Sequence, residues 1–443
     1  MRDIALATFL LGSLPFILWR PVLGVFLWVW VSVMSPHRLT YGFAYDFPFA
    51  QLIAIATLIG LVVSRQPKRL PVTPVTATLF ALLVWMSVTT LFAIDTAESL
   101  PVWEKVMKVQ LMIFVTAALL HSRQHVQILI WIIAASVAFY AVKGGLFTLR
   151  VGGEQRVWGP WGSYIEDNNS LALATVMMIP LLRYLHLQAT HRWIRHGLLA
   201  AMLLSGLSAL GSQSRGALLA IAAMLAFMWL KSRAKVGTGI ALLVLFSVGV
   251  AFMPDKWDTR MRSIENYEED TSAQGRFNAW MNAFHLAQDR PLGGGFAIYT
   301  PEVFARYAPD PTDVHSAHSI YFQVLGEHGF VGLLLFLLLW LLVWRDASWI
   351  DRRARTQEGW QWASDLARMV QVALVGYGVG GAFLNLAYYD VPYNLIVALV
   401  VTRILVERQI QSAAEAAPTT SAADGVRPDP PISGVNSLKA PRS

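Results

Sequence analysis

His315 and His318 lie directly before a long apolar run, a position that suits proton transfer at a membrane surface. A neutral imidazole can accept a proton from a hydroxyl group at ordinary pH because its pKa lies near neutrality. The two histidines are three positions apart and could share one face, so either of them could be the base. No third ligand with suitable spacing follows them and the chain has no cysteine, so we predict no metal site.

Two arginines could bind an anionic group near these histidines. Arg215 follows a Ser-Gln-Ser sequence at the head of an apolar run, and these small polar neighbours favour phosphate binding over a snorkelling membrane anchor. A guanidinium group suits phosphate because it is permanently charged and donates two parallel hydrogen bonds. Arg276 opens a second predicted helix, where the helix dipole opposes a cation, so an anionic ligand or one of the preceding carboxylates would account for it.

Two other polar stretches are predicted to lie on the same side of the membrane. Residues 167–169 (Asp-Asn-Asn) precede an apolar run and suit a helix cap, for which Asp and Asn are favoured. Residues 388–390 (Tyr-Tyr-Asp) suit either an interfacial aromatic belt with a turn or a platform for a sugar. The predicted substrate-binding residues are Gln213, Asp167, Asn168, Asn169, His315, Tyr321, Tyr389 and Asp390.

The composition indicates an all-α polytopic membrane protein. Of the 443 residues 55% are hydrophobic and only 14% are charged, against roughly 25% charged in an ordinary soluble domain. The net charge of +7 lies largely in short loops, where it indicates topology and not nucleic-acid binding. Candidate spans are residues 4–18, 22–34, 49–64, 75–93, 104–121, 126–149, 169–187, 196–211, 215–230, 237–253, 319–344, 366–385 and 392–407.

The number of spans is 12 or 13. Pro15, Arg20 and Pro21 leave the first 34 residues as two short spans or one broken element. Loops rich in Arg and Lys alternate with acidic, aromatic or long loops, and the positive-inside rule places the basic loops in the cytoplasm. The histidines and both arginines then lie outside.

Three parts are predicted along the chain. Residues 1–410 form one transmembrane domain, and within it residues 254–317 form an external lid loop. This lid loop begins with a charged stretch and continues as an amphipathic helix, in which Phe277, Trp280, Met281 and Phe284 recur at helical spacing. Residues 411–443 are rich in Ala, Pro, Ser and Thr and are predicted to be a disordered cytoplasmic tail.

The order of these motifs resembles the O-antigen ligase and polymerase-like membrane glycosyltransferases. The matching features are Ser-Arg-Gly around Arg215 opening a span, a long external loop with Gly275-Arg276, and His318-Ser319 followed by Tyr321. Glycines at 326, 329 and 332 continue the last motif and are expected to permit close helix packing. Residues 36–39 and 166–169 are similar to a subgroup of exosortase-associated O-glycosylation ligases. The resemblance covers nearly the whole chain except the tail.

The resemblance implies a type C glycosyltransferase-like fold and a defined reaction. A glycan would move from undecaprenyl diphosphate to an acceptor hydroxyl at the periplasmic face of a bacterial inner membrane, with inversion and without nucleotide, metal or other cofactor. Arg215 and Arg276 would stabilise the diphosphate leaving group, and His318 would deprotonate the acceptor, with His315 as the other candidate base. An apolar cavity between spans would hold the polyprenyl chain.

The expected partners are the undecaprenyl-diphosphate-linked donor, membrane lipid and lipid A-core as the acceptor, with no nucleic acid. Within the same family, a protein Ser or Thr or a growing glycan could be the acceptor instead. A lipid-linked glycan transporter is the alternative from another class. Such a transporter would show repeated halves and ionisable residues near the midplane of several spans, and neither is evident in this sequence.

Overall fold

The computed structural model describes residues 1–232, 234–262 and 271–416, and 77% of them are helical, with no strand within these ranges. The all-α prediction is therefore confirmed. The helices are α1 (Arg2–Trp19), α2 (Pro21–Met34), the 3-10 helix η1 (Pro36–Leu39), α3 (Phe49–Val63), α4 (Pro74–Leu91), α5 (Thr96–Leu119), α6 (Arg123–Val151), α7 (Asn168–Gln188), α8 (Arg192–Gly211), α9 (Arg215–Lys231), α10 (Lys235–Ala251), α11 (Asp255–Arg262), α12 (Thr271–Asp289), α13 (Pro301–Tyr307), α14 (Ile320–Ala354), α15 (Gln361–Gly381) and α16 (Asp390–Ala416).

Each predicted span coincides with one of these helices. Six helices in the described part of the chain are long and apolar enough to cross a membrane: α1, α4, α6, α7, α8 and α14. Helices α2, α3 and α10 are apolar but shorter. The protein is therefore a polytopic all-α membrane protein, and the count of 12 or 13 spans stays a prediction.

The first 34 residues form two helices. The chain breaks at Arg20, whose backbone is not helical, and Pro21 begins α2. Proline is favoured at the first position of a helix because its missing N–H group would have no partner there.

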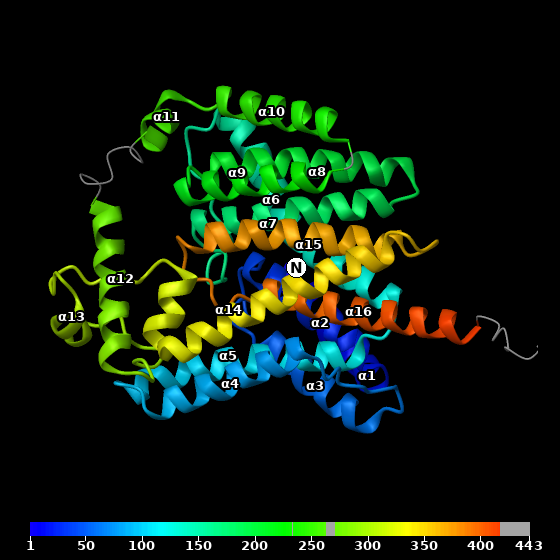
Figure 1. Cartoon of the computed structure of the whole chain (residues 1–443), viewed down its shortest axis with the longest axis horizontal. Helices are drawn as coiled ribbons and strands as arrows, with labels where there is room; N and C mark the ends of the chain where they lie inside the picture. The colour runs from blue at the N-terminus through cyan, green and yellow to red at the C-terminus, as the bar shows by residue number, and fades with distance from the viewer. Residues whose placement is uncertain (233, 263–270, 417–443) are drawn as a thin grey trace, which may run out of the picture. The chain divides into compact units, whose positions relative to one another are not determined.

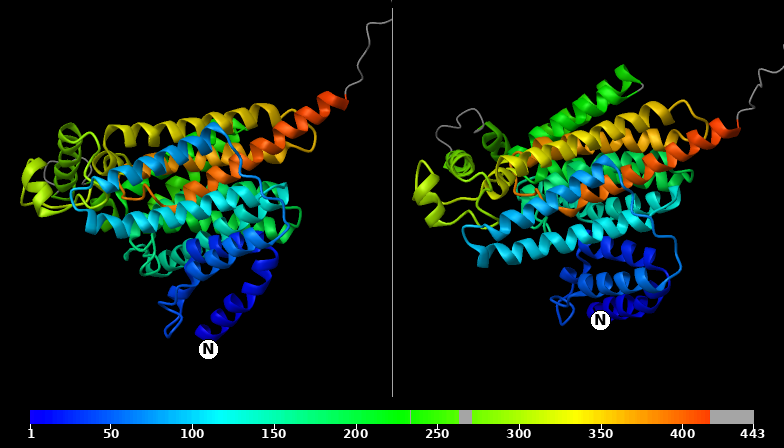
Figure 2. Two further views of the ribbon diagram at one scale, coloured as in Figure 1. Left: turned by 90° about the horizontal axis from the view of Figure 1, so that it is seen from below. Right: turned by 60° about the horizontal axis from the view of Figure 1, so that its bottom comes forward.

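Helix α7 lies at the centre of the bundle. It packs against α8, α15, α6 and α9, and the five helices lie side by side in Figures 1 and 2. From Ser170 to Leu182 every residue of α7 is buried, because the sequence there is apolar or small on all sides of the helix. The N-terminal end of this helix is consequently a fixed reference for the residues that precede it.

The lid loop contains α11, α12 and α13. Helix α12 packs beside the first part of α14, as both figures show, through the fully buried Ala279 and Ala283. Its bulky residues Phe277 and Met281 are exposed instead, as expected for a helix that lies against a membrane surface. The predicted charged start of the lid loop is described only in α11, because Glu265, Glu268, Glu269 and Asp270 lie outside the described residues.

Helix α14 is kinked at Gly329, which has a φ of 67°. A turn of the lid loop, the three glycines at residues 293–295, packs into this kink. There Gly294 N donates to Gly326 O (2.9 Å) and Gly295 N donates to Glu327 O (2.9 Å). A Cβ atom at Gly329 would overlap the carbonyl oxygen of Pro291. The glycines of α14 thus serve close packing, as predicted, but Gly329 packs against a loop segment and not against another helix.

The chain divides into two units, Met1–Val406 and Glu407–Ser443. Helix α16 continues to Ala416, so the first six residues of the predicted tail are helical. Residues 417–443, the rest of that predicted tail, lie outside the described residues.

Candidate active site

His318 is presented by an unusual backbone conformation just before α14. Its φ is 42°, in the left-handed region that non-glycine residues rarely adopt. The neighbours Ala317 and Ser319 are buried, at 0% and 1% exposure, whereas His318 is exposed. The turn therefore directs one imidazole away from the packed interior while its neighbours fix the backbone. Such conformations persist only where the surroundings hold them.

Helix α12 supplies those surroundings. Trp280 Nε1 donates to the carbonyl oxygen of Ala317 (2.7 Å), directly before His318. The indole ring also stacks on Phe322 of α14, with ring centroids 5.0 Å apart and an angle of 6° between the planes. One side chain of the lid loop thus fixes both the histidine segment and the first turn of α14.

A second contact from α12 fixes the segment that precedes the histidines. The buried Asn278 donates through Nδ2 to the carbonyl oxygens of Asp310 (2.8 Å) and Asp313 (2.9 Å), and its Oδ1 accepts from Asp310 N (2.8 Å). His315 lies against Gly275, where a Cβ atom would be 2.6 Å from the imidazole Cδ2. A side chain at position 275 would thus displace the His315 imidazole, and Arg276 follows Gly275 directly.

Charged groups from three segments act on His318. Partial burial lowers the pKa of its imidazole, and the positive charges of Arg276 and His315 lower it further, while the carboxylate of Asp167 raises it. The net direction is downward, so the imidazole is neutral at neutral pH. Arg276, His315 and Asp167 therefore lie within electrostatic range of His318.

Asp167 and Asn168 connect this group to the turn that carries Arg215. Asp167 caps α7, accepting from Asn169 N (2.9 Å) and Ser170 N (3.0 Å). The buried Asn168 donates through Nδ2 to the carbonyl oxygen of Ser212 (2.8 Å), three residues before Arg215. The start of α7 thus bridges His318 and the start of α9.

The turn before α9 is itself firmly held. Gln213 has a φ of 56° and donates through Nε2 to the carbonyl oxygen of Gly153 (2.9 Å). Ser214 caps α9 by accepting from Ala217 N (3.2 Å), and Trp257 of the lid loop donates to the carbonyl oxygen of Leu210 (3.0 Å). Arg215 is half-buried at the first position of α9.

The remaining predicted residues have other surroundings. Tyr321 donates to the carbonyl oxygen of Gly378 (2.8 Å) and joins α14 to α15. Tyr389 and Asp390 are buried in a second polar cluster, where Asp390 accepts from Ser32 and the Tyr389 ring lies 6.1 Å from that of Tyr164. In this cluster the Lys105 Nζ atom lies 4.2 Å from the centre of the Tyr164 ring and within electrostatic range of Asp390.

The sequence did not predict that two residues, Trp280 and Asn278, would position the histidine segment. Trp280 is recognisable only as part of an apolar pattern, and Asn278 carries no local motif. The available signal is that Asn278 and Asn282 are four positions apart and share one face of the predicted helix, so this polar face is a candidate for contacts with another segment.

The arrangement can combine a neutral base with a nearby cation. An exposed imidazole with a lowered pKa can accept a proton, and Arg276 near it can bind an anion released in the same step. Residues 200–337 match the model of a family described as O-antigen ligase, and this range contains all three residues, Arg215, Arg276 and His318. Residues 1–190 match the model of a family of unknown function. No curated protein matches the chain.

Proposed function

From membership of an O-antigen ligase/polymerase-like family, which the match of residues 200–337 supports, we propose that the protein is a glycan ligase. It transfers a glycan from undecaprenyl diphosphate to a hydroxyl group of lipid A-core at the periplasmic face of a bacterial inner membrane. The observation that supports this most is the grouping of His318, Arg276 and Asp167 beside the turn that carries Arg215.

In the proposed reaction, neutral His318 accepts the proton of the acceptor hydroxyl while its oxygen attacks the anomeric carbon of the donor sugar. The bond between that carbon and the diphosphate oxygen breaks, and undecaprenyl diphosphate leaves with the bonding electrons. Attack opposite the leaving group inverts the anomeric configuration. Arg215 and Arg276 stabilise the charge that develops on the diphosphate, and their permanent charge needs no proton transfer.

Arg276 would also tune the base. In the free protein its charge lowers the pKa of His318, which keeps the imidazole neutral and ready to accept a proton. Bound diphosphate would offset the charge of Arg276, so the imidazole would become more basic in the donor complex. Donor binding would thus strengthen the base at the step in which it acts.

The acceptor is the part of the proposal that an experiment must decide. The purified protein would be reconstituted with undecaprenyl-diphosphate glycan, with EDTA and without nucleotide, and offered lipid A-core, an unfolded secreted protein rich in Ser and Thr, or free glycan. Transfer to lipid A-core alone supports the proposal. Transfer to the protein or elongation of the glycan instead would assign a protein O-oligosaccharyltransferase or a polymerase of the same family.

A further inference from the structure

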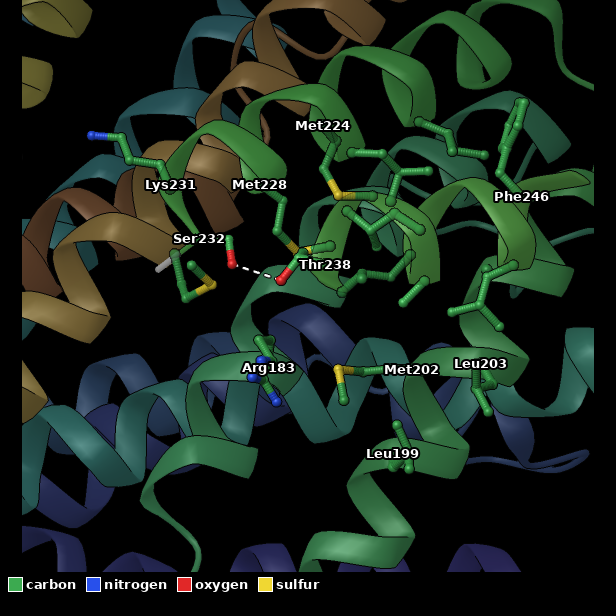
Figure 3. Close-up of a pocket in the computed structure, with 18 of the residues that line it drawn as sticks. Arg183, Leu199, Met202, Leu203, Met224, Met228, Lys231, Ser232, Thr238 and Phe246 are labelled. Atoms are coloured by element: carbon green, nitrogen blue, oxygen red, sulfur yellow. Dashed lines mark hydrogen bonds between the residues drawn. The ribbon is translucent and has the colours of Figure 1, made fainter. Parts of the chain in front are cut away.

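A large cavity extends along α9, from Leu210 near the turn before Arg215 to Lys231 at the far end of that helix. It has a volume of about 840 Å³ and is formed by α7, α8, α9, α10 and the start of α15 (Figure 3). Apolar side chains line most of it, among them Met202, Leu203, Met224, Met228 and Phe246. A cavity of this size and lining in a membrane protein fits hydrocarbon chains.

One end of the cavity carries an excess of positive charge. Arg183, Lys231 and Arg368 line it there, and Asp365 is the single carboxylate among the described lining residues. Asp351 lies within electrostatic range of Lys231, and Asp365 within range of Arg183. Even if both carboxylates are counted, three cations against two anions leave an excess positive charge.

Hydroxyl groups complete this end. Ser232 Oγ and Thr238 Oγ1 share a hydrogen bond of 2.6 Å, and both residues line the cavity beside Lys231 (Figure 3). Cations and hydroxyls next to an apolar cavity match the chemistry of a lipid phosphate with its acyl chains.

The packing of α10 supports an occupant. None of its residues is buried, although it forms one wall of the cavity and leads through residue 254 into the lid loop. A hydrocarbon chain between α10 and α8 would therefore cover apolar side chains of α10 that the protein itself leaves accessible.

The donor's diphosphate does not explain the cations. Arg215 begins α9 and Lys231 ends it, so the two charges are about 24 Å apart at ~1.5 Å per residue. A diphosphate bound at Arg215 would thus be at the opposite end of the helix from the cationic end of the cavity.

We propose that the cavity binds an anionic glycerophospholipid from the leaflet on the side of the basic loops. Its phosphate contacts Arg183, Lys231 and Arg368, and its acyl chains lie against the methionines and leucines of α8 and α9. This lipid steadies α10 and hence the start of the lid loop. The inference does not depend on the proposed glycan transfer.

The test is lipid binding to the delipidated full chain in detergent, measured by native mass spectrometry with equal amounts of phosphatidylglycerol and phosphatidylcholine. The native chain should prefer phosphatidylglycerol. The double variant Lys231→Gln/Arg368→Gln should weaken phosphatidylglycerol binding by about 25-fold, since each cation near an anionic headgroup contributes about five-fold. The matched control, Arg352→Gln/Arg353→Gln, removes two exposed arginines on the same side and should change nothing.

A second variant tests the cavity itself. A Cβ atom at Gly206 meets no atom within 4 Å, so Gly206→Leu should fold and fill the space, reducing the binding of both lipids. Gly197→Leu, on the same helix but outside the lining, is its control.

Three results would overturn the proposal: equal binding of the two lipids by the native chain, an unchanged preference in the double variant, or displacement of phosphatidylglycerol by undecaprenyl phosphate. The last result would assign the cavity to the donor's chain. Thermal unfolding of each variant checks that it is folded. If the double variant does not fold, Arg368→Gln alone takes its place.

Discussion

The two histidines of the lid loop differ in what holds them. His315 Nε2 lies 2.6 Å from Asp313 Oδ1, and this contact fixes its ring and occupies one of its nitrogens. His318 is exposed and its nearest charged neighbours act on it electrostatically, with Asp167 opposing Arg276 and His315. A carboxylate partner leaves the second nitrogen of His315 available, so the proposed assignment of the base to His318 rests on its position beside Arg276 and Asp167.

The pH dependence of transfer should report these neighbours. Only neutral imidazole accepts a proton, so activity falls as the pH drops through the pKa of His318. Because that pKa is lowered, the acid limb of kcat/KM should lie below the ordinary value of 6.5. Arg276→Gln removes a cation and should move the limb to higher pH, whereas Asp167→Asn removes an anion and should move it to lower pH.

Asp167→Asn is a clean variant because asparagine caps a helix as well as aspartate does. Rate measurements with each variant across about pH 4.5–8.5, roughly two units either side of the ordinary histidine pKa, would decide between these directions. If the acid limbs of Arg276→Gln and Asp167→Asn shifted in the same direction, the opposite effects of these two side chains on the pKa of His318 would be contradicted.

The two arginines should act on the rate of the chemical step. Replacing either Arg215 or Arg276 by glutamine should lower kcat by about 10²–10³-fold, the usual effect of removing one donor that stabilises developing charge. Arg306→Gln, an exposed arginine of the same lid loop, is the matched control and should leave kcat unchanged. Single-turnover transfer with saturating donor would measure the effect, and equal losses in all three variants would indicate a general electrostatic effect.

At the scale of elements, α12 is the part that assembles the site. It contacts the histidine segment through Gly275, Asn278 and Trp280 on one side and exposes Phe277 and Met281 on the other. The exposed pair can lie in the membrane surface, so the helix links the position of the histidines to the bilayer.

Trp280→Phe should separate positioning from packing. Phenylalanine keeps a ring that can stack on Phe322 of α14 but loses the hydrogen bond to the carbonyl oxygen of Ala317. We expect a small loss of stability, about 1 kcal/mol, and a larger fall in kcat than in donor affinity. Met281→Leu is the exposed control, and an unchanged kcat in Trp280→Phe would remove α12 from the positioning of His318.

The sequence predicted the elements well and their contacts only in part. Hydropathy predicted the spans. The alternation of basic and acidic loops predicted that His318, Arg276 and Asp167 lie on one side, because both patterns depend on local composition. The contact between Gly275 and His315 could not be predicted, since it joins segments 40 residues apart without a shared motif. The burial of Asp390 beside Ser32 was hidden for the same reason.

At the scale of the whole molecule, the proposed reaction requires that the lid loop and the basic loops lie on opposite sides of the membrane. Beyond the kink at Gly329, helix α14 continues for 25 residues to Ala354, about 38 Å at ~1.5 Å per residue, more than the roughly 30 Å of a bilayer core. It begins at the lid loop and ends beside Arg352 and Arg353, so its two ends can reach opposite faces.

The absence of cysteine from the sequence makes this topology easy to test. A single cysteine in place of the exposed Glu302 on α13 should react with a membrane-impermeant maleimide in intact spheroplasts. A single cysteine in place of the exposed Arg353 should react only after the membrane is opened. The reverse pattern would place the candidate site on the cytoplasmic side and contradict a periplasmic reaction.

The most direct test of the central claim is glycan transfer by proteoliposomes that contain the native chain, His318→Gln or His315→Gln, with undecaprenyl-diphosphate glycan and lipid A-core. All three proteins should bind the donor. The native chain and His315→Gln should transfer the glycan, and His318→Gln should be slower by about 10²–10⁴-fold, the usual contribution of a general base. Transfer by His318→Gln at the native rate would contradict the assignment of the base and with it the proposed mechanism.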